Sequence, residues 1–178
     1  MLFYLLVHPS QCGVILWTVR AACVLYVFAL ALWLARKPRF APLLWTLGLA
    51  CYLCHVLSAF AFHYDWSHRA AYVETARQTA ALFGIKWGGG LYFNYLFTAV
   101  WGADVFWIWH NRASYGKRPR WVGATVHTFL AFMFFNGAVV FASGWIRWFG
   151  LGSIACLAVL WIRYGLTSYP KNGQTIPL

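Results

Sequence analysis

A Cys-x-x-Cys-His pattern formed by Cys51, Cys54 and His55 is the first feature of the sequence that could carry chemistry. This spacing is the attachment signature of a c-type haem, in which both thiols bond to the porphyrin and the histidine binds the iron. Arg20 could then bind a haem propionate, a lipid phosphate or a substrate carboxylate, because a guanidinium group suits such anions. The alternative for Arg20 is that its charged end reaches outward to the membrane surface and only fixes the position of its helix. The alternative is that the cysteines are small packing residues and that His55 bonds to a neighbour such as Asn94.

A second group of potential ligands follows along the chain: His63, Asp65 and His68, with Glu74 nearby as a supporting polar residue. Imidazole and carboxylate groups are ligands of zinc, iron and copper, so this group predicts a transition-metal site. His63 and His68 are five residues apart, and a bend in the chain is needed to bring them to one metal ion. The alternative is an interfacial loop whose polar side chains meet water and lipid headgroups.

These residues belong to a chain of 178 residues that is 62% hydrophobic and 10% charged, whereas a soluble globular domain has about 25% charged residues. The formal net charge is +11, but the basic residues fall mainly in short connections between apolar runs. In that position they set membrane orientation rather than bind nucleic acid. We therefore expect an integral membrane protein whose first partner is the lipid bilayer, with other membrane subunits as further candidates and no nucleic-acid partner.

The apolar runs predict an all-α, polytopic membrane helical bundle. About 20 apolar residues cross the roughly 30 Å hydrocarbon core of a bilayer, and five runs reach about this length. The expected spans are residues 13–35, 41–63, 88–110, 121–143 and 146–163. The outer loop, residues 64–87, contains good helix formers after Ser67 and predicts a short interfacial helix. Residues 1–168 then form one membrane-embedded domain, and residues 169–178 form a polar C-terminal tail.

The charges of the connections predict how the bundle is oriented. Connections on one side carry nine basic residues and those on the other side carry four. Basic residues accumulate on the cytoplasmic side of membrane proteins. We therefore expect the N-terminus outside and the C-terminus in the cytoplasm, with the loop that carries His63 and His68 on the outer side.

All five expected spans place a polar side chain at a common depth. These side chains are Arg20, His55, Asn94, Asn136 and Ser153. At a rise of about 1.5 Å per residue, all of them lie roughly 10 Å below the outer surface. Polar groups in a spanning helix usually face the bundle interior, so we expect these five side chains to converge.

Asp104 and His127 form a second, inner layer on adjacent spans, where we expect them to pair. His127 and Asn136 belong to one span but are nine residues apart, which is half a turn out of phase. We therefore expect that they do not both point squarely at one interior.

These patterns predict a small multi-pass membrane protein with an outer-leaflet site at which His55, His63, Asp65 and His68 bind a metal or haem for redox or hydrolytic chemistry. The supporting polar residues of this site are Arg20, Glu74, Asn94 and Asn136. A different class of function is an accessory or structural subunit of a larger membrane complex, because 21% of the residues are aromatic and only three are acidic. A third class is a channel or transporter in which Asp104 and His127 form a second station along a path. The sequence assigns no enzymatic reaction to any of these residues.

Overall fold

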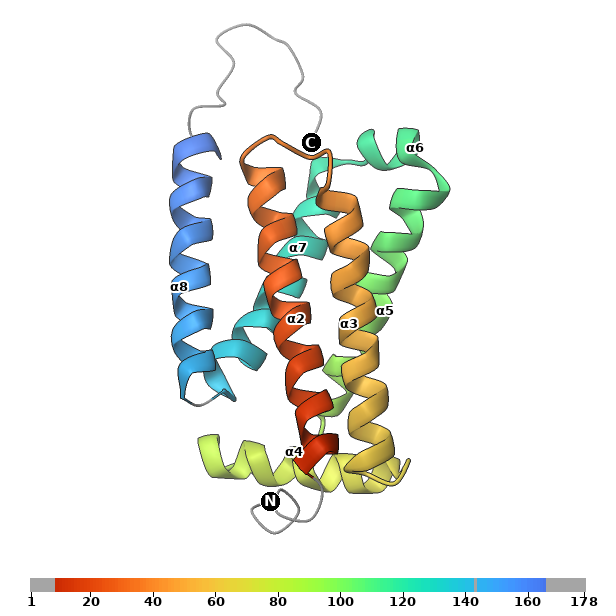
Figure 1. The fold of residues 1–178 in the computed structure, drawn as a ribbon, viewed down its shortest axis with the longest axis vertical. Coiled ribbons are helices and arrows are strands. Elements are labelled where there is room, and N and C mark those ends of the chain that lie inside the picture. Colours follow the sequence, from red (N-terminus) through yellow and green to blue (C-terminus); the bar gives the residue numbers. More distant parts are fainter. Residues whose placement is uncertain (1–8, 143, 166–178) are drawn as a thin grey trace, which may run out of the picture.

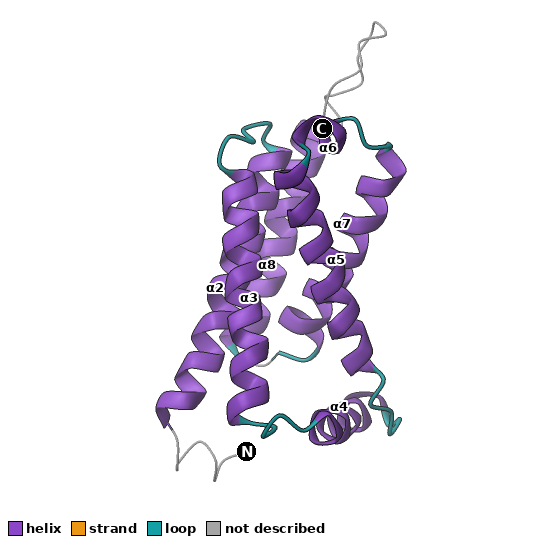
Figure 2. Cartoon of the chain, turned by 90° about the vertical axis from the view of Figure 1, so that its right-hand side faces the viewer, coloured by secondary structure: helices purple, strands orange, loops and turns teal. Residues whose placement is uncertain are grey.

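The computed structural model describes residues 9–142 and 144–165, and within these ranges the chain is helical with no β-strand (Figure 2). The elements are α2 (Pro9–Leu34), α3 (Ala41–Phe62), α4 (His68–Phe83), α5 (Gly90–His110), α6 (Arg112–Gly116), α7 (Arg120–Phe135), η1 (Asn136–Val140), α8 (Trp145–Leu160) and η2 (Trp161–Gly165). The segments η1 and η2 are π-helical turns that continue α7 and α8 directly.

Five helical segments run between the two ends of the molecule: α2, α3, α5, α7 with η1, and α8 with η2 (Figure 1). Helix α4 lies across one end of this bundle, and the short α6 lies at the opposite end. We call these the α4 end and the α6 end. The structure thus confirms an all-α bundle with a short additional helix in the connection between α3 and α5.

In the part of the chain that the structure describes, four helical segments are long and apolar enough to cross a membrane: Gly13–Leu34, Ala41–Phe62, Trp121–Val140 and Ile146–Arg163. The expected fifth span, residues 88–110, is present as the 21-residue helix α5 but is not among these four. The reason is chemical, because α5 contains Asn94, Asp104 and several tyrosine and tryptophan side chains with polar atoms. Six residues of α5 are buried, so part of this polar surface faces protein. The four apolar segments indicate an integral membrane protein.

Helix α4 begins and ends at residues that carry clear local signals. The Ser67 Oγ accepts a hydrogen bond of 3.2 Å from the backbone nitrogen of Ala70, which caps the N-terminus. Gly84 ends the helix with a φ of 73°, a left-handed conformation that glycine adopts without steric cost. Just before α4, Asp65 and Trp66 also have positive φ angles, 47° and 57°. The chain therefore turns sharply between α3 and α4.

An aromatic core joins α2, α3, α5 and α7 in the middle of the bundle and towards the α6 end. Tyr26 is 2% exposed, and its ring centroid lies 5.2 Å from that of Trp45, 5.6 Å from Trp101 and 5.0 Å from Phe134. Gly48 on α3 allows Trp101 to approach, because a Cβ at this position would lie 3.1 Å from Trp101 Cζ2. Such aromatic pairs add about 0.5–1.5 kcal/mol each beyond their burial. These contacts fix the four helices relative to one another.

Candidate functional site

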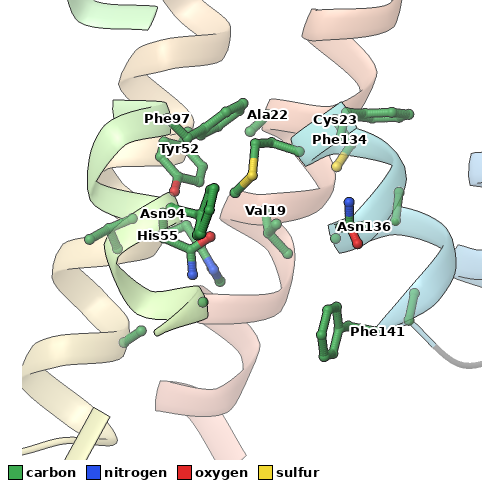
Figure 3. A pocket seen from close by; sticks show the side chains of 18 of the residues that line it. Val19, Ala22, Cys23, Tyr52, His55, Asn94, Phe97, Phe134, Asn136 and Phe141 are labelled. Atoms are coloured by element: carbon green, nitrogen blue, oxygen red, sulfur yellow. The ribbon is translucent and has the colours of Figure 1, made fainter. Parts of the chain in front are cut away.

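A cavity of about 930 Å³ lies between α2, α3, α5 and the α7–η1 segment, in the half of the bundle nearer the α4 end (Figure 3). Helix α4 borders this cavity through Thr75, Gln78, Thr79 and Phe83. The volume is at the upper end of the range for small-molecule sites, which is about 300–1,000 Å³. The aromatic core and this cavity therefore divide the bundle into a packed half and an open half.

The wall of the cavity is mainly aromatic and aliphatic. Its large rings include Tyr26, Tyr52, Phe97, Trp101, Phe132 and Phe134. Four of the five side chains that were expected to converge, Arg20, His55, Asn94 and Asn136, line it as well, whereas Ser153 is buried on α8 and does not. Figure 3 shows His55 and Asn94 on one side of the cavity and Asn136 on the other. Among the described residues that line the cavity, none is an aspartate or a glutamate.

His55 has one ring nitrogen fixed by the backbone of a neighbouring helix. Its Nδ1 lies 2.9 Å from the carbonyl oxygen of Ile15 on α2. A carbonyl oxygen can only accept a hydrogen bond, so Nδ1 is the donor. The bond goes to this carbonyl and not to Asn94, which was the partner suggested by the sequence. The ring is half-buried and lines the cavity, to which Nε2 remains available.

Asn136 lies at the point where α7 becomes the π-helical segment η1. Its Nδ2 donates a hydrogen bond of 2.8 Å to the carbonyl oxygen of Phe132, and the side-chain oxygen Oδ1 remains as an acceptor. The Arg147 Nε of α8 donates to the carbonyl oxygens of Val139 and Ala142, both at 3.0 Å. Single π-helical turns often occur at functional sites. The wall that carries Asn136 is thus held by a side chain from the next helix.

Arg20 lies at the edge of the cavity. The Cζ atom of Arg20 is 4.9 Å from the ring centroid of Trp17, a cation–π distance, and the Arg20 side chain is half-buried. Trp17 is 67% exposed. Arg20 therefore places a positive charge on the cavity wall close to the outer face of α2.

The two cysteines of the Cys-x-x-Cys-His pattern do not share the environment of His55. Cys51 is half-buried and Cys54 is exposed, both are free thiols, and neither lines the cavity. Cys54 directly precedes His55 on α3, so the two side chains are about 100° apart around the helix. Cys51 is one helical turn before His55 and on the same side of α3, but it does not line the cavity either. Neither thiol therefore belongs to the wall of the space in which His55 could bind a cofactor.

Glu74 is engaged with residues of its own helix. Its carboxylate accepts hydrogen bonds from Arg77 Nε at 2.8 Å, Arg77 Nη2 at 2.6 Å and Gln78 Nε2 at 3.0 Å. The hydrogen bonds from Arg77 hold the pKa of Glu74 below its usual value, and the charge of nearby His63 adds to this effect. The His63 ring lies 4.8 Å from that of Tyr64. Glu74 and His63 are thus close, but Glu74 is mainly an ion-pair partner of Arg77.

The remaining residues of the expected metal site point to other partners. The Nδ1 of His68 lies 3.0 Å from the hydroxyl oxygen of Tyr95 on α5, and Asp65 is exposed in the left-handed turn. In the described part of the chain, no group of three or more histidine, cysteine, aspartate or glutamate side chains is placed to hold a metal ion. The metal site at His63, Asp65 and His68 stays a prediction of the sequence.

Asp104 is the centre of a second polar cluster, near the α6 end. It is 4% exposed, and its Oδ1 accepts a hydrogen bond of 2.9 Å from Arg118 Nη1. Its Oδ2 accepts hydrogen bonds from Trp45 Nε1 at 3.0 Å and from the Tyr115 hydroxyl at 3.2 Å. The other guanidinium nitrogen, Arg118 Nη2, lies 3.1 Å from His127 Nε2. The expected pairing of Asp104 with His127 therefore runs through Arg118.

Three members of this cluster were not predicted from the sequence: Arg118, Trp45 and Tyr115. The signal was present, because a buried aspartate in an apolar helix requires a cation, and several basic residues lie between α6 and α7. The ring of Tyr115 lies 3.8 Å below the Arg118 Cζ. Burial, and then the charge of Asp104, raise the pKa of the Tyr115 hydroxyl well above its usual value. Tyr115 is therefore a neutral hydrogen-bond donor at physiological pH.

The described chain is a helical bundle with four segments apolar enough to cross a membrane and with an internal space large enough for a ligand. No protein-family model matches the chain, and neither a curated protein nor a solved structure shows significant similarity to it.

Proposed function

We propose that the chain is a five-span membrane protein that binds a lipophilic molecule with a polar head group in this cavity. The fifth span is α5, whose 21 residues correspond to about 31 Å of helix. It lies alongside the other long helices in Figure 1 and buries Asp104 inside the protein. The distribution of basic residues supports an outer α4 end and a cytoplasmic α6 end, with the N-terminus outside.

The observation that carries the proposal is the cavity itself. Its aromatic and aliphatic wall suits a hydrocarbon chain or a ring system, and its polar side chains suit a head group. These polar side chains gather in the half of the bundle nearer the α4 end, where an amphiphile from the outer leaflet would place its head. Burial of a lipid chain against this wall is favourable, because the lining rings of Phe93, Phe132 and Phe141 are 43%, 55% and 43% exposed.

The test is purification of the full chain in lipid nanodiscs, followed by mass spectrometry of the organic extract. We expect one class of amphiphile at a molar ratio close to that of the protein. Val19→Trp should remove it, because Val19 lines the cavity (Figure 3) and the larger ring fills the space. Val14→Trp is the matched control, since Val14 is on the same helix, 46% exposed and outside the cavity. Equal ligand content in both variants would contradict the proposal.

Haem is a second candidate for the same cavity. His55 Nε2 is available to bind iron, and Met133 also lines the cavity and could supply a thioether. Arg20 suits a propionate. Because Cys51 and Cys54 do not line the cavity, the residues present fit a non-covalent haem and not a thioether-linked one. Bound haem would supply one-electron chemistry.

The alkaline pyridine absorption spectrum of the purified protein decides between the two ligands. A b-type signature that disappears in His55→Leu would establish haem in the cavity. A c-type signature would mean that the thiols reach the porphyrin and that the helix is arranged differently. Absence of any haem band, together with a bound lipid, would leave the lipophilic ligand as the function of the cavity.

A further inference from the structure

The hydrogen-bonding groups of the cavity restrict the head group that the proposed ligand can carry. His55 is the most constrained of them, because its Nδ1–H is already donated to the Ile15 carbonyl oxygen at 2.9 Å. A positively charged imidazolium would need a nearby anion in such an apolar wall. None of the described residues that line the cavity is acidic, and Arg20 already contributes a positive charge. His55 is therefore neutral, and its Nε2 presents a lone pair.

Two asparagine side chains belong to the polar lining, which also contains Thr75, Gln78, Thr79 and Thr98. The three threonine hydroxyls donate to backbone carbonyl oxygens of their own helices, and Gln78 Nε2 donates to Glu74. The Asn136 amide donates one hydrogen to the Phe132 carbonyl oxygen at 2.8 Å, which leaves its Oδ1 as a second acceptor. Asn94 is exposed on α5 where it lines the cavity, and its amide offers both donors and an acceptor. The lining thus contains two acceptors, His55 Nε2 and Asn136 Oδ1, and donors from the amides of Asn94 and Asn136, because only one Nδ2 hydrogen of Asn136 is donated to Phe132.

We infer that the ligand of the cavity is an uncharged lipid whose head group is a hydroxyl. This inference rests on the proposed function of the cavity. A hydroxyl donates to an acceptor such as His55 Nε2 and accepts from an amide such as that of Asn94. An anionic head can pair with Arg20 at the edge of the cavity, but it has no hydrogen to donate to His55 Nε2 and leaves that lone pair without a partner. A cationic head has donors, but it meets the like charge of Arg20 without an acidic partner in the described lining.

An ester, ketone or ether head is also disfavoured. Such groups only accept hydrogen bonds, so they leave the lone pair of His55 Nε2 without a partner in a partly desolvated site. A buried acceptor without a partner lowers affinity by about tenfold, the change that corresponds to roughly 1.4 kcal/mol. A lipid with a hydroxyl head should therefore bind the cavity more tightly than its methyl ether, although the two molecules have nearly the same hydrocarbon surface.

The test uses the full chain in nanodiscs and a photoactivatable derivative of hexadecanol. Cross-linked residues are identified by mass spectrometry, and labelling is competed with unlabelled hexadecanol, its methyl ether, hexadecyl sulfate and hexadecylamine. We expect labelling of cavity residues and competition by the alcohol at a concentration at least about tenfold lower than by the other three. The ratio of the concentrations at which hexadecanol and its methyl ether compete does not depend on the amount of folded protein.

Variants then assign the effect to named atoms. His55→Leu should reduce the preference for alcohol over ether to about one, because the acceptor is removed. Asn94→Leu should also reduce it, and this variant leaves the hydrogen bond between α2 and α3 intact if His55→Leu folds poorly. Cys54→Leu is the matched control, since Cys54 is exposed on the same helix and does not line the cavity. It should keep the full preference.

Each possible outcome has a distinct meaning. No labelling of the cavity by the probe would overturn the proposed function. Labelling with equal competition by all four molecules would retain a lipophilic ligand and overturn the hydroxyl assignment. Stronger competition by the sulfate or by the amine would replace the assignment with an anionic or a cationic head group.

Discussion

Arg118 is the residue whose removal should most destabilise the packed half of the bundle. Its Nη1 lies 2.9 Å from Asp104 Oδ1, and the two side chains are 13% and 2% exposed. At an effective dielectric constant of about 20, two unit charges at this distance attract by about 6 kcal/mol. Arg118→Met leaves the carboxylate with only Trp45 and Tyr115 as donors. Because removal of one partner leaves an uncompensated buried charge, we expect a loss of about 3–5 kcal/mol in the free energy of unfolding.

The free energy of unfolding can be measured by titration with sodium dodecyl sulfate in mixed micelles. Arg112→Met is the control, because Arg112 is exposed in α6 with its Cζ 4.9 Å from the ring of Trp109. We expect it to change the free energy by no more than about 1 kcal/mol. Asp104→Asn combined with Arg118→Met should regain at least about 1 kcal/mol over Arg118→Met alone, because no buried charge remains. Equal losses in Arg118→Met and Arg112→Met would refute the reasoning.

Two further predictions concern packing and pH. Gly48→Val should lower the free energy of unfolding by about 1–3 kcal/mol in the same titration, because the valine Cβ would press on Trp101. The control is Gly13→Ala, which should be nearly neutral because nothing lies within 4 Å of a Cβ at that position. Helix α4 should become less stable in acid, because Arg77 lowers the pKa of Glu74. The stabilisation of α4 by this ion pair is complete above the usual pKa of glutamate, and it is lost as the pH falls through the lowered pKa of Glu74. Hydrogen exchange of the α4 backbone amides should report this loss, and Glu74→Gln should remove its dependence on pH. If the variant shows the same pH dependence, the ion pair between Glu74 and Arg77 is not the cause of the loss.

The positions of the helices were largely predictable from the sequence because apolar runs and charged connections set their limits. The expected spans at residues 41–63 and 88–110 differ from α3 and α5 by no more than two residues at either end. The π-helical segment at Asn136 was not predictable, since its wider turn depends on contacts such as the capping of its carbonyl oxygens by Arg147.

The convergence of four polar side chains was also predictable, because depth follows from residue number along a helix. The direction of each side chain was harder to predict. His127 and Asn136 are out of phase, as expected, and they serve different neighbours: His127 contacts the rings of Trp33 and Trp45, whereas Asn136 lines the cavity. Helix α7 runs obliquely behind α2 in Figure 1, so its two halves meet different helices.

The expected ligand groups show why residue types alone could not define a site. His63 lies near Glu74 on α4, and His68 bonds to Tyr95 on α5, so neighbours in sequence have separate partners in space. Asp104 likewise has both oxygens engaged by donors, which favours a structural role over a station in a transport path. Only tertiary structure brings Arg118 back over α5, and no spacing in the sequence encodes that contact.

The division of the bundle into a packed half and an open half has a consequence for the lifetime of the protein in the membrane. In the open half, a bound lipid would complete the hydrophobic core that the chain itself leaves unfinished. A molecule that binds only the folded form stabilises it in proportion to the logarithm of its concentration. The abundance of the protein would then follow the supply of its ligand, and depletion of that lipid would expose the helices around the cavity to membrane proteases before those around Tyr26 and Trp45.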